Sequence, residues 1–292
     1  MGEKDITEKL LEDYDDVFAD IVNVLLFGGR DVVKTDSLVS AGVRSQYKAD
    51  DSKVHETERD VAKYWKDGNT CIALYGIENQ TRPDKLMPLR VIGYDGASYK
   101  NQLISKRKKI LPVVTLVLYF GKNHWDMPTN LKESIEINKE LEYYVNDYRI
   151  HVFEISWLSE KQISMFKSDF RLVADFFVKR RKDPDYRPKD RTEIKHIEEV
   201  LKLLSVFTGD HRYEEVLADP DINEVDNMCE VADRLWNGGK AEGLAAGKAN
   251  TLYSLVQDGD LSIEKASERM EVPVSEFEHL MTEAGYKLPA MA

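Results

Sequence analysis

Hydrophobic positions near the start of the chain recur with the period of an α-helix. One face of this segment collects Leu10, Leu11, Tyr14, Phe18, Ile21, Val22 and Leu25. Gly28-Gly29 follows as a helix C-cap signal, so the pattern predicts a helix over residues 6–27. Residues 30–58 are polar and irregular, and we expect turns there with at most one short strand.

The next two apolar runs are typical of paired strands. Residues 59–65 and 70–77 are separated by Lys66-Asp67-Gly68-Asn69, and its Asp-Gly pair is a strong hairpin signal. The second run is almost wholly apolar, which indicates a strand covered on both faces. A sheet that lies between helices is therefore favoured.

Later patterns complete a mixed α/β domain. They predict a helix over 87–109, strands over 113–120 and 150–155, and a helix over 159–181. The expected fold class is a mixed sheet flanked by helices, and the first domain is predicted to span residues 1–182.

Residues 183–292 are predicted to form a helical region for interaction or oligomerisation. The basic segment 179–188 looks like a linker, and helices are expected over 193–207 and 225–236. Glycine then recurs at 239, 243 and 247, which fits either close helix approach or a hinge. Residues 251–285 predict a helical hairpin whose second helix carries Glu276, Glu278 and Glu283. These acids favour a protein partner over DNA.

Composition and charge narrow the possible functions. The 292 residues are 42% hydrophobic and 32% charged, as in a soluble globular protein, and the net charge is −12. A nucleic acid would have to be held locally, by a basic patch or by metal ions. No basic start precedes an apolar stretch, and the apolar run 110–121 is too short to cross a bilayer. We expect a cytoplasmic protein without a membrane partner.

Two acidic residues mark the candidate chemistry. Asp60 begins the first hairpin strand, and Glu78 follows the second. In a hairpin that turns at Asp67-Gly68, the numbers of two paired residues add up to about 135 to 138. Asp60 is therefore expected opposite residues 75 to 78. Their carboxylates could share a hard cation such as Mg²⁺, which prefers oxygen ligands. Asp15 interrupts the apolar face of the first helix and is a third candidate.

These residues, taken together, carry a resemblance to a known family. An acidic first helix, Asp60, Glu78-Asn79-Gln80-Thr81, Met87-Pro88-Leu89-Arg90 and Tyr94 resemble the Rpn family of recombination-promoting nucleases, also called YhgA-like transposases. That family belongs to the PD-(D/E)XK nuclease superfamily. The resemblance covers about residues 10 to 180 and implies a restriction-endonuclease-like fold.

The resemblance implies a metal-dependent DNA endonuclease linked to recombination, mobile elements or defence. Asp60, Glu78 and the carbonyl of Asn79 would hold Mg²⁺ or Mn²⁺, and Asp15 remains a further catalytic candidate. Gln80 stands where lysine is commonest in the superfamily, and its implied role is to orient the attacking water. Replacement of lysine by glutamine is usual in Rpn-like sequences.

Several basic or aromatic side chains are candidates for nucleic-acid contact. Arg90 and Tyr94 are four residues apart on one helix face and could contact phosphate or brace the carboxylates. Residues 179–191 contain seven Lys or Arg and three Asp, a local charge of +4. The candidates for backbone contact are Lys106, Arg107, Lys108, Arg180 and Arg181. A solvated linker and a helix C-terminus that favours cations explain these basic runs equally well.

The residues leave alternatives open. A catalytically inactive DNA- or protein-binding module with the nuclease fold would need neither metal nor cleavage, and an RNA nuclease could use the same site. Because nucleases that cut two strands often work as dimers, we expect a homodimer.

Overall fold

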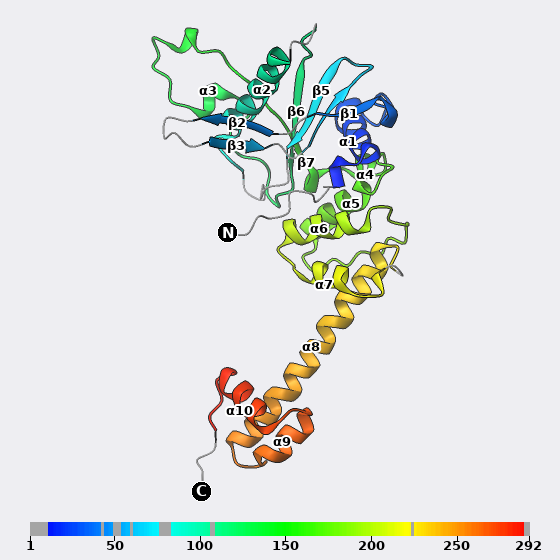
Figure 1. Ribbon diagram of the computed structural model, residues 1–292, viewed down its shortest axis with the longest axis vertical. Helices are drawn as coiled ribbons and strands as arrows, with labels where there is room; N and C mark the ends of the chain where they lie inside the picture. The colour runs from blue at the N-terminus through cyan, green and yellow to red at the C-terminus, as the bar shows by residue number, and fades with distance from the viewer. Residues whose placement is uncertain are drawn as a thin grey trace. The chain divides into compact units, whose positions relative to one another are not determined.

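The computed structural model shows an α/β domain followed by a helical unit (Figure 1). It describes residues 11–41, 44–48, 54–58, 61–75, 83–105, 109–222 and 225–288. The chain divides into two compact units, and the boundary lies between Glu230 and Val231. The sequence had suggested a boundary after residue 182.

A five-stranded mixed sheet forms the centre of the first unit, in the order β1-β4-β5-β6-β7. Its strands are β1 (Leu38–Ser40), β4 (Val61–Trp65), β5 (Thr70–Tyr75), β6 (Val113–Tyr119) and β7 (His151–Glu154). β4 pairs antiparallel with β1 and β5, whereas β5, β6 and β7 run parallel. The expected α/β class with a mixed, helix-flanked sheet is thus confirmed.

The region 30–58 contains more strand than its polar pattern suggested. Besides β1, it forms β2 (Arg44–Lys48) and β3 (Val54–Glu58), which pair antiparallel as a separate two-stranded sheet. The expectation of at most one short strand was wrong. A short two-stranded ladder is held by backbone hydrogen bonds and needs no apolar run, so hydrophobic patterning gave little sign of it.

Different helices cover the two faces of the central sheet. Lys63, Ile72 and Val114 lie opposite one another in neighbouring strands and so share a face. Lys63 contacts α1 (Asp15–Phe27), which follows the short turn η1 (Leu11–Asp13).

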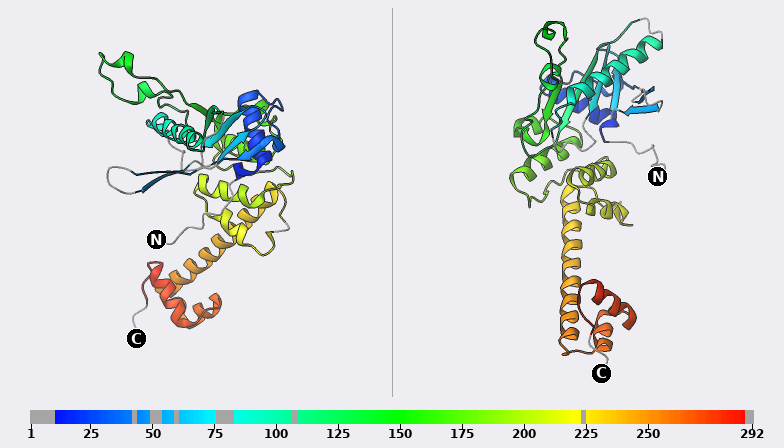
Figure 2. Two further views of the ribbon diagram at one scale, coloured as in Figure 1. Left: turned by 45° about the horizontal axis from the view of Figure 1, so that its top comes forward. Right: turned by 90° about the vertical axis from the view of Figure 1, so that its left-hand side faces the viewer.

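The other face is covered by α2 (Met87–Ile104), which connects the parallel strands β5 and β6. Met87, Val91 and Tyr94 pack there on Val117 and Ile150. Figure 2 shows α2 on the outside of the sheet in both views.

The predicted helix over 159–181 is interrupted. It is divided into α4 (Glu160–Ile163) and α5 (Phe170–Lys182). Between them the backbone N–H groups of Lys167 and Ser168 each donate to Asp20 Oδ2 over 2.7 Å. Asp20 on α1 thus satisfies donors that a continuous helix would have used internally.

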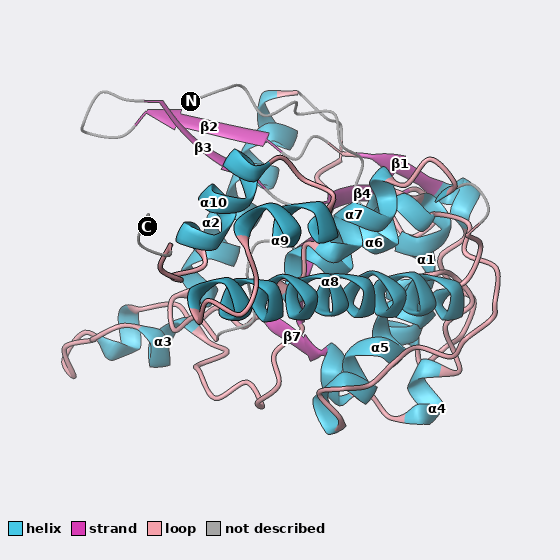
Figure 3. Ribbon diagram, turned by 90° about the horizontal axis from the view of Figure 1, so that it is seen from below, coloured by secondary structure: helices cyan, strands magenta, loops and turns pink. Residues whose placement is uncertain are grey.

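After β7 the described chain contains helices and loops only (Figure 3). The first unit continues with α6 (Ile197–Thr208) and α7 (Arg212–Ala218). Phe207 of α6 contacts Phe120 and Phe177, with ring centroids 4.3 and 5.9 Å apart. This aromatic packing explains why the first unit extends beyond residue 182.

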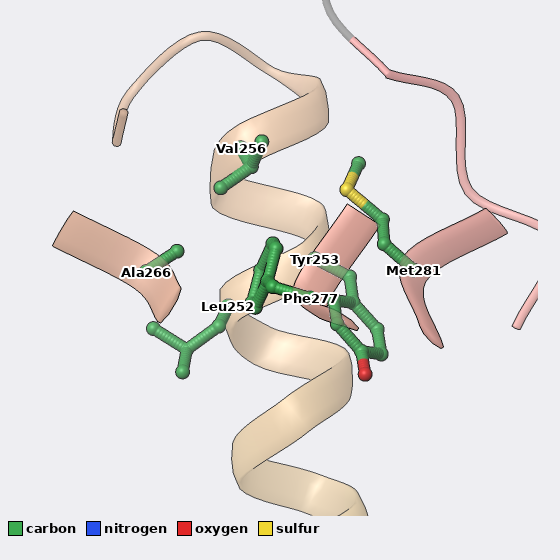
Figure 4. Close-up of a cluster of buried hydrophobic side chains, with 6 residues drawn as sticks. All are labelled: Leu252, Tyr253, Val256, Ala266, Phe277 and Met281. Atoms are coloured by element: carbon green, nitrogen blue, oxygen red, sulfur yellow. The ribbon is translucent and has the colours of Figure 1, made fainter. Parts of the chain in front are cut away.

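The second unit contains most of a long helix and two short helices. They are α8 (Met228–Gln257), which begins just before the unit boundary, α9 (Ile263–Met270) and α10 (Val274–Glu283). Figure 4 shows its core, which consists of Leu252, Tyr253, Val256, Ala266, Phe277 and Met281. α8 is continuous through Gly239, Gly243 and Gly247.

The turn between β4 and β5 gives a first testable prediction. A Cβ at Gly68 would lie 2.0 Å from the Trp65 ring, so Gly68→Ala should lower the free energy of unfolding by about 1 to 3 kcal/mol. Gly93→Ala in α2 is the control, because its Cβ would meet nothing within 4 Å and alanine favours a helix. Equal effects in a urea titration would contradict this explanation.

Candidate functional site

The ends of the strands identify one edge of the sheet for the candidate site. In the β4–β5 hairpin Val61 pairs with Leu74. Their residue numbers add up to 135, which agrees with the register expected from a turn at Asp67-Gly68. The start of β4 and the end of β5 therefore lie together, opposite the turn. Because β6 and β7 run parallel to β5, Tyr119 and Glu154 end at this same edge.

The central catalytic candidates lie outside the described residues. Asp60 immediately precedes β4, while Glu78, Asn79 and Gln80 follow β5 by three to five positions. Their proximity and their metal-binding role stay predictions. Within the part of the chain that is described, no group of three or more His, Cys, Asp or Glu side chains could hold a metal ion.

Arg90 and Tyr94 both belong to α2 but differ in environment. The Arg90 side chain is partly exposed, and its Nη1 lies 3.4 Å from Asp84 Oδ2. Tyr94 is buried in the core between α2 and the sheet. Of its two suggested roles, bracing fits this buried position better than contact with a phosphate.

A buried carboxylate next to Tyr94 escaped the sequence analysis. Asp95 accepts a 2.6 Å hydrogen bond from Thr115 Oγ1 and another from the Tyr148 hydroxyl. These bonds join α2 to β6 and to the segment before β7. Its position four residues after Val91, on the buried side of α2, was the available signal.

Asp15 lies on the other face of the sheet from Arg90 and Tyr94. Its Oδ1 accepts a 2.6 Å hydrogen bond from Lys63 Nζ, whose side chain is only 2% exposed. Lys63 Nζ also donates to the Asp13 carbonyl over 2.8 Å. The geometry gives Asp15 a structural partner, and its catalytic role stays a prediction.

Glu12 is a second acid that sequence reasoning missed. It is 1% exposed in η1, the turn that packs against β4 and thus beside the strand that follows Asp60. Its place directly after the apolar pair Leu10-Leu11 was the only sequence signal. Glu12 is therefore a buried acid next to β4.

The basic side chains at the end of α5 make local contacts. Arg181 stacks on Trp157 at 3.6 Å from the ring centroid, and its Nε donates to the Ser156 carbonyl over 2.8 Å. Arg180 lies over the Phe176 ring, and Lys179 pairs with Asp175. These contacts agree with the structural explanation of the basic run. Lys106, Arg107 and Lys108 lie outside the described residues.

Polar contacts also surround the ends of β6 and β7. His124 Nδ1 lies 3.1 Å from Glu154 Oε1, which also accepts a 2.6 Å hydrogen bond from the Trp125 backbone N–H. The His124 ring stacks on Trp157 at 3.6 Å. Since Arg181 is equally close to that ring centre, His124 and Arg181 lie on opposite faces of Trp157.

Tyr14 links the N-terminal turn to α6. Its hydroxyl donates to Glu199 Oε1 over 2.6 Å, and its ring stacks on His196 at 3.7 Å. The hydrogen bond to Glu199, followed by burial, raises the pKa of Tyr14 to about 12. The phenol therefore stays protonated in the folded protein at pH values where an unfolded chain would lose the proton.

This pKa shift predicts how Tyr14→Phe acts. The substitution should lower the free energy of unfolding by about 1 kcal/mol near neutral pH, since a hydrogen bond to a carboxylate is lost from a partly exposed site. The wild-type advantage should be complete below pH 10 and disappear as the pH rises to about 12. Urea unfolding of both proteins across this range measures it, and a constant difference would contradict the assignment.

Comparisons with known proteins agree with the resemblance noted in the sequence. Residues 64–200 match the family model described as "Putative transposase, YhgA-like", so this segment is similar to that family. The match includes Glu78, Gln80, Arg90 and Tyr94, and it begins after Asp60. Searches of curated proteins and of solved structures found no match. None of the described helices is long and apolar enough to span a membrane.

Proposed function

We propose that this protein is a Mg²⁺-dependent endonuclease that hydrolyses phosphodiester bonds in DNA. The family match over residues 64–200 carries the proposal, because that family is named for DNA transposition. The hairpin geometry supports it, since the strand ends next to Asp60 and Glu78 lie at one edge of the sheet. A link to recombination, mobile elements or defence is part of the proposal.

The proposed roles follow the residue types. Asp60, Glu78 and the Asn79 carbonyl would hold Mg²⁺, or Mn²⁺ in its place, because both ions accept oxygen ligands. Bound metal would polarise the scissile phosphate and lower the pKa of a water. Gln80 would orient that water through its amide. Arg90 is the described side chain best placed to contact phosphate, since it is partly exposed on α2.

The activity is tested with purified full-length protein and three labelled substrates. Supercoiled DNA, linear DNA and RNA are incubated with Mg²⁺, with Mn²⁺ and with EDTA. We expect nicking or linearisation of DNA with either metal and intact substrate in EDTA. Cleavage of RNA alone would reassign the substrate, while metal-independent DNA binding without cleavage would indicate a non-catalytic module.

A further inference from the structure

An ordered arm of the first unit ends in exposed apolar side chains. We use "the arm" for residues 131–148, which include α3 (Leu131–Ser134) and the turn η3 (Glu142–Tyr144). Tyr143 is 90% exposed and Tyr144 77%, and Leu141 beside them is also exposed. Figures 1 and 2 show the arm reaching away from the sheet. Single exposed apolar residues are ordinary, but three together at one tip indicate a binding surface.

The arm is held in place by its own hydrogen bonds. At its base Leu131 N–H donates to the Tyr148 carbonyl over 2.9 Å, and Asn130 forms a β-bridge with Arg149. Further out, Lys132 Nζ donates to the Glu142 carbonyl over 2.9 Å. These bonds restrain the arm within one chain, which lowers the entropy lost when a partner binds its tip.

The outer face of α2 is a second uncovered apolar surface in the same unit. It consists of Leu86, Leu89, Gly93, Gly96, Lys100, Leu103 and Ile104. Leu103 and Ile104 are 65% and 66% exposed. A Cβ added at Gly93 or Gly96 would meet nothing within 4 Å, so nothing in the described chain uses these glycines for close packing. Each costs about 1 kcal/mol in a helix relative to alanine. Without a Cβ at either position, a side chain of a partner can approach the helix backbone closely there.

The two surfaces carry opposite charge. The arm contains five acidic and two basic residues, with Glu140 and Glu142 on either side of Leu141. Lys100 lies on the outer face of α2, and Lys85 and Lys109 near the ends of this helix are also exposed, whereas Asp95 of the same helix is buried. Surfaces of opposite charge attract each other, whereas two surfaces of the same charge repel. The basic α2 face therefore fits the acidic tip better than it fits a second α2.

We propose that this protein forms a symmetric dimer in which the arm tip of each copy packs on the outer face of α2 of the other. Tyr143 and Tyr144 would cover the helix backbone at Gly93 and Gly96. Within one chain both surfaces stay exposed, so a second copy supplies the missing partner for each. An exchange of this kind is isologous, and it forms two equal contacts about one two-fold axis. The proposal does not depend on nuclease activity.

The oligomeric state of the full-length protein tests the proposal without DNA or metal. Sedimentation velocity over the micromolar range should show a concentration-dependent dimer. A tip variant, Tyr143→Ser with Tyr144→Ser, should raise the dimer Kd at least about tenfold, because aromatic side chains commonly dominate interface energies. A face variant, Leu103→Ser with Ile104→Ser, should do the same. Circular dichroism should show both variants folded, since all four side chains are exposed.

Mixing the two variants distinguishes an exchanged dimer from other arrangements. The tip variant has an intact α2 face, and the face variant has an intact tip, so one heterodimer keeps one complete contact. We expect labelled variants to associate more tightly with each other than either does with itself. A dimer formed through α2 alone would show no such gain.

A control variant uses an exposed leucine in the other unit. Leu244→Ser on α8 should leave the dimer unchanged, although Leu244 is exposed beside the glycine series that could allow close helix approach. A wild-type monomer throughout the concentration range would overturn the proposal. So would loss of the dimer in Leu244→Ser while the tip and face variants still associate. Absence of DNA cleavage would leave either result unaffected.

Discussion

Replacing Glu78 by Ala should abolish Mg²⁺-dependent DNA cleavage, with a loss of at least about a thousandfold. The proposed site relies on a few oxygen ligands, and a catalytic metal supplies several kcal/mol of transition-state stabilisation. Loss of one carboxylate ligand removes most of that contribution. The measurement is the initial rate of supercoiled-DNA nicking at saturating Mg²⁺, compared with wild type.

Two further variants make this result specific. Asp60→Ala should lose cleavage to the same degree, because both carboxylates are proposed to hold one ion. Asp36→Ala removes an exposed acid in the turn before β1 and should retain the wild-type rate. Mn²⁺ binding measured by calorimetry should fall in Asp60→Ala and Glu78→Ala. Full cleavage by Glu78→Ala would reject the site.

Replacing Lys63 by Met should destabilise the first unit by about 3 kcal/mol. Lys63 is 2% exposed, and its ammonium contacts Asp15, the Asp13 carbonyl and Asp13 Oδ1 at 2.6, 2.8 and 3.2 Å. Breaking a buried ion pair commonly costs 3 to 5 kcal/mol, and the lower value of about 3 applies because the two aspartates are partly exposed. Urea unfolding monitored by tryptophan fluorescence measures the change.

An exposed ion pair in the same unit provides the matched control. Lys34 pairs with Asp31, and both side chains are more than half exposed. Lys34→Met should therefore change stability by less than about 1 kcal/mol, because solvent screens such pairs. Similar losses in Lys63→Met and Lys34→Met would show that burial of Lys63 contributes nothing. Asp15→Asn should lower stability in the same direction as Lys63→Met, whether or not Asp15 takes part in catalysis.

The sequence predicted the central strands well because each is an apolar run of its own. β4, β5, β6 and β7 lie within the segments expected from hydrophobic patterning, and the Asp67-Gly68 signal located the hairpin turn. The first helix and α2 were also expected, although both are shorter than predicted. These elements depend mainly on local residue order, which a single sequence displays.

Apart from the local β2–β3 hairpin, the main unexpected features depend on partners that are distant in the sequence. The loop between α4 and α5 exists because Asp20 accepts hydrogen bonds from Lys167 and Ser168. Lys63 looks like a surface residue until its contact with Asp15, 48 positions away, is known. Asp95 is similar, since its partner Tyr148 lies 53 positions further along. Patterning cannot supply such pairs.

By itself, the sequence determined the α/β class, the hairpin register and the YhgA-like resemblance, because periodicity, turn residues and motif spacing are local properties. Only the tertiary structure decided that Tyr94 is buried, that Asp15 faces Lys63 and that Arg181 stacks on Trp157. The physical reason is that burial and ion pairing depend on which elements meet in space. The role of a side chain depends on its neighbours in space, and the order of residues along the chain does not show which residues these are.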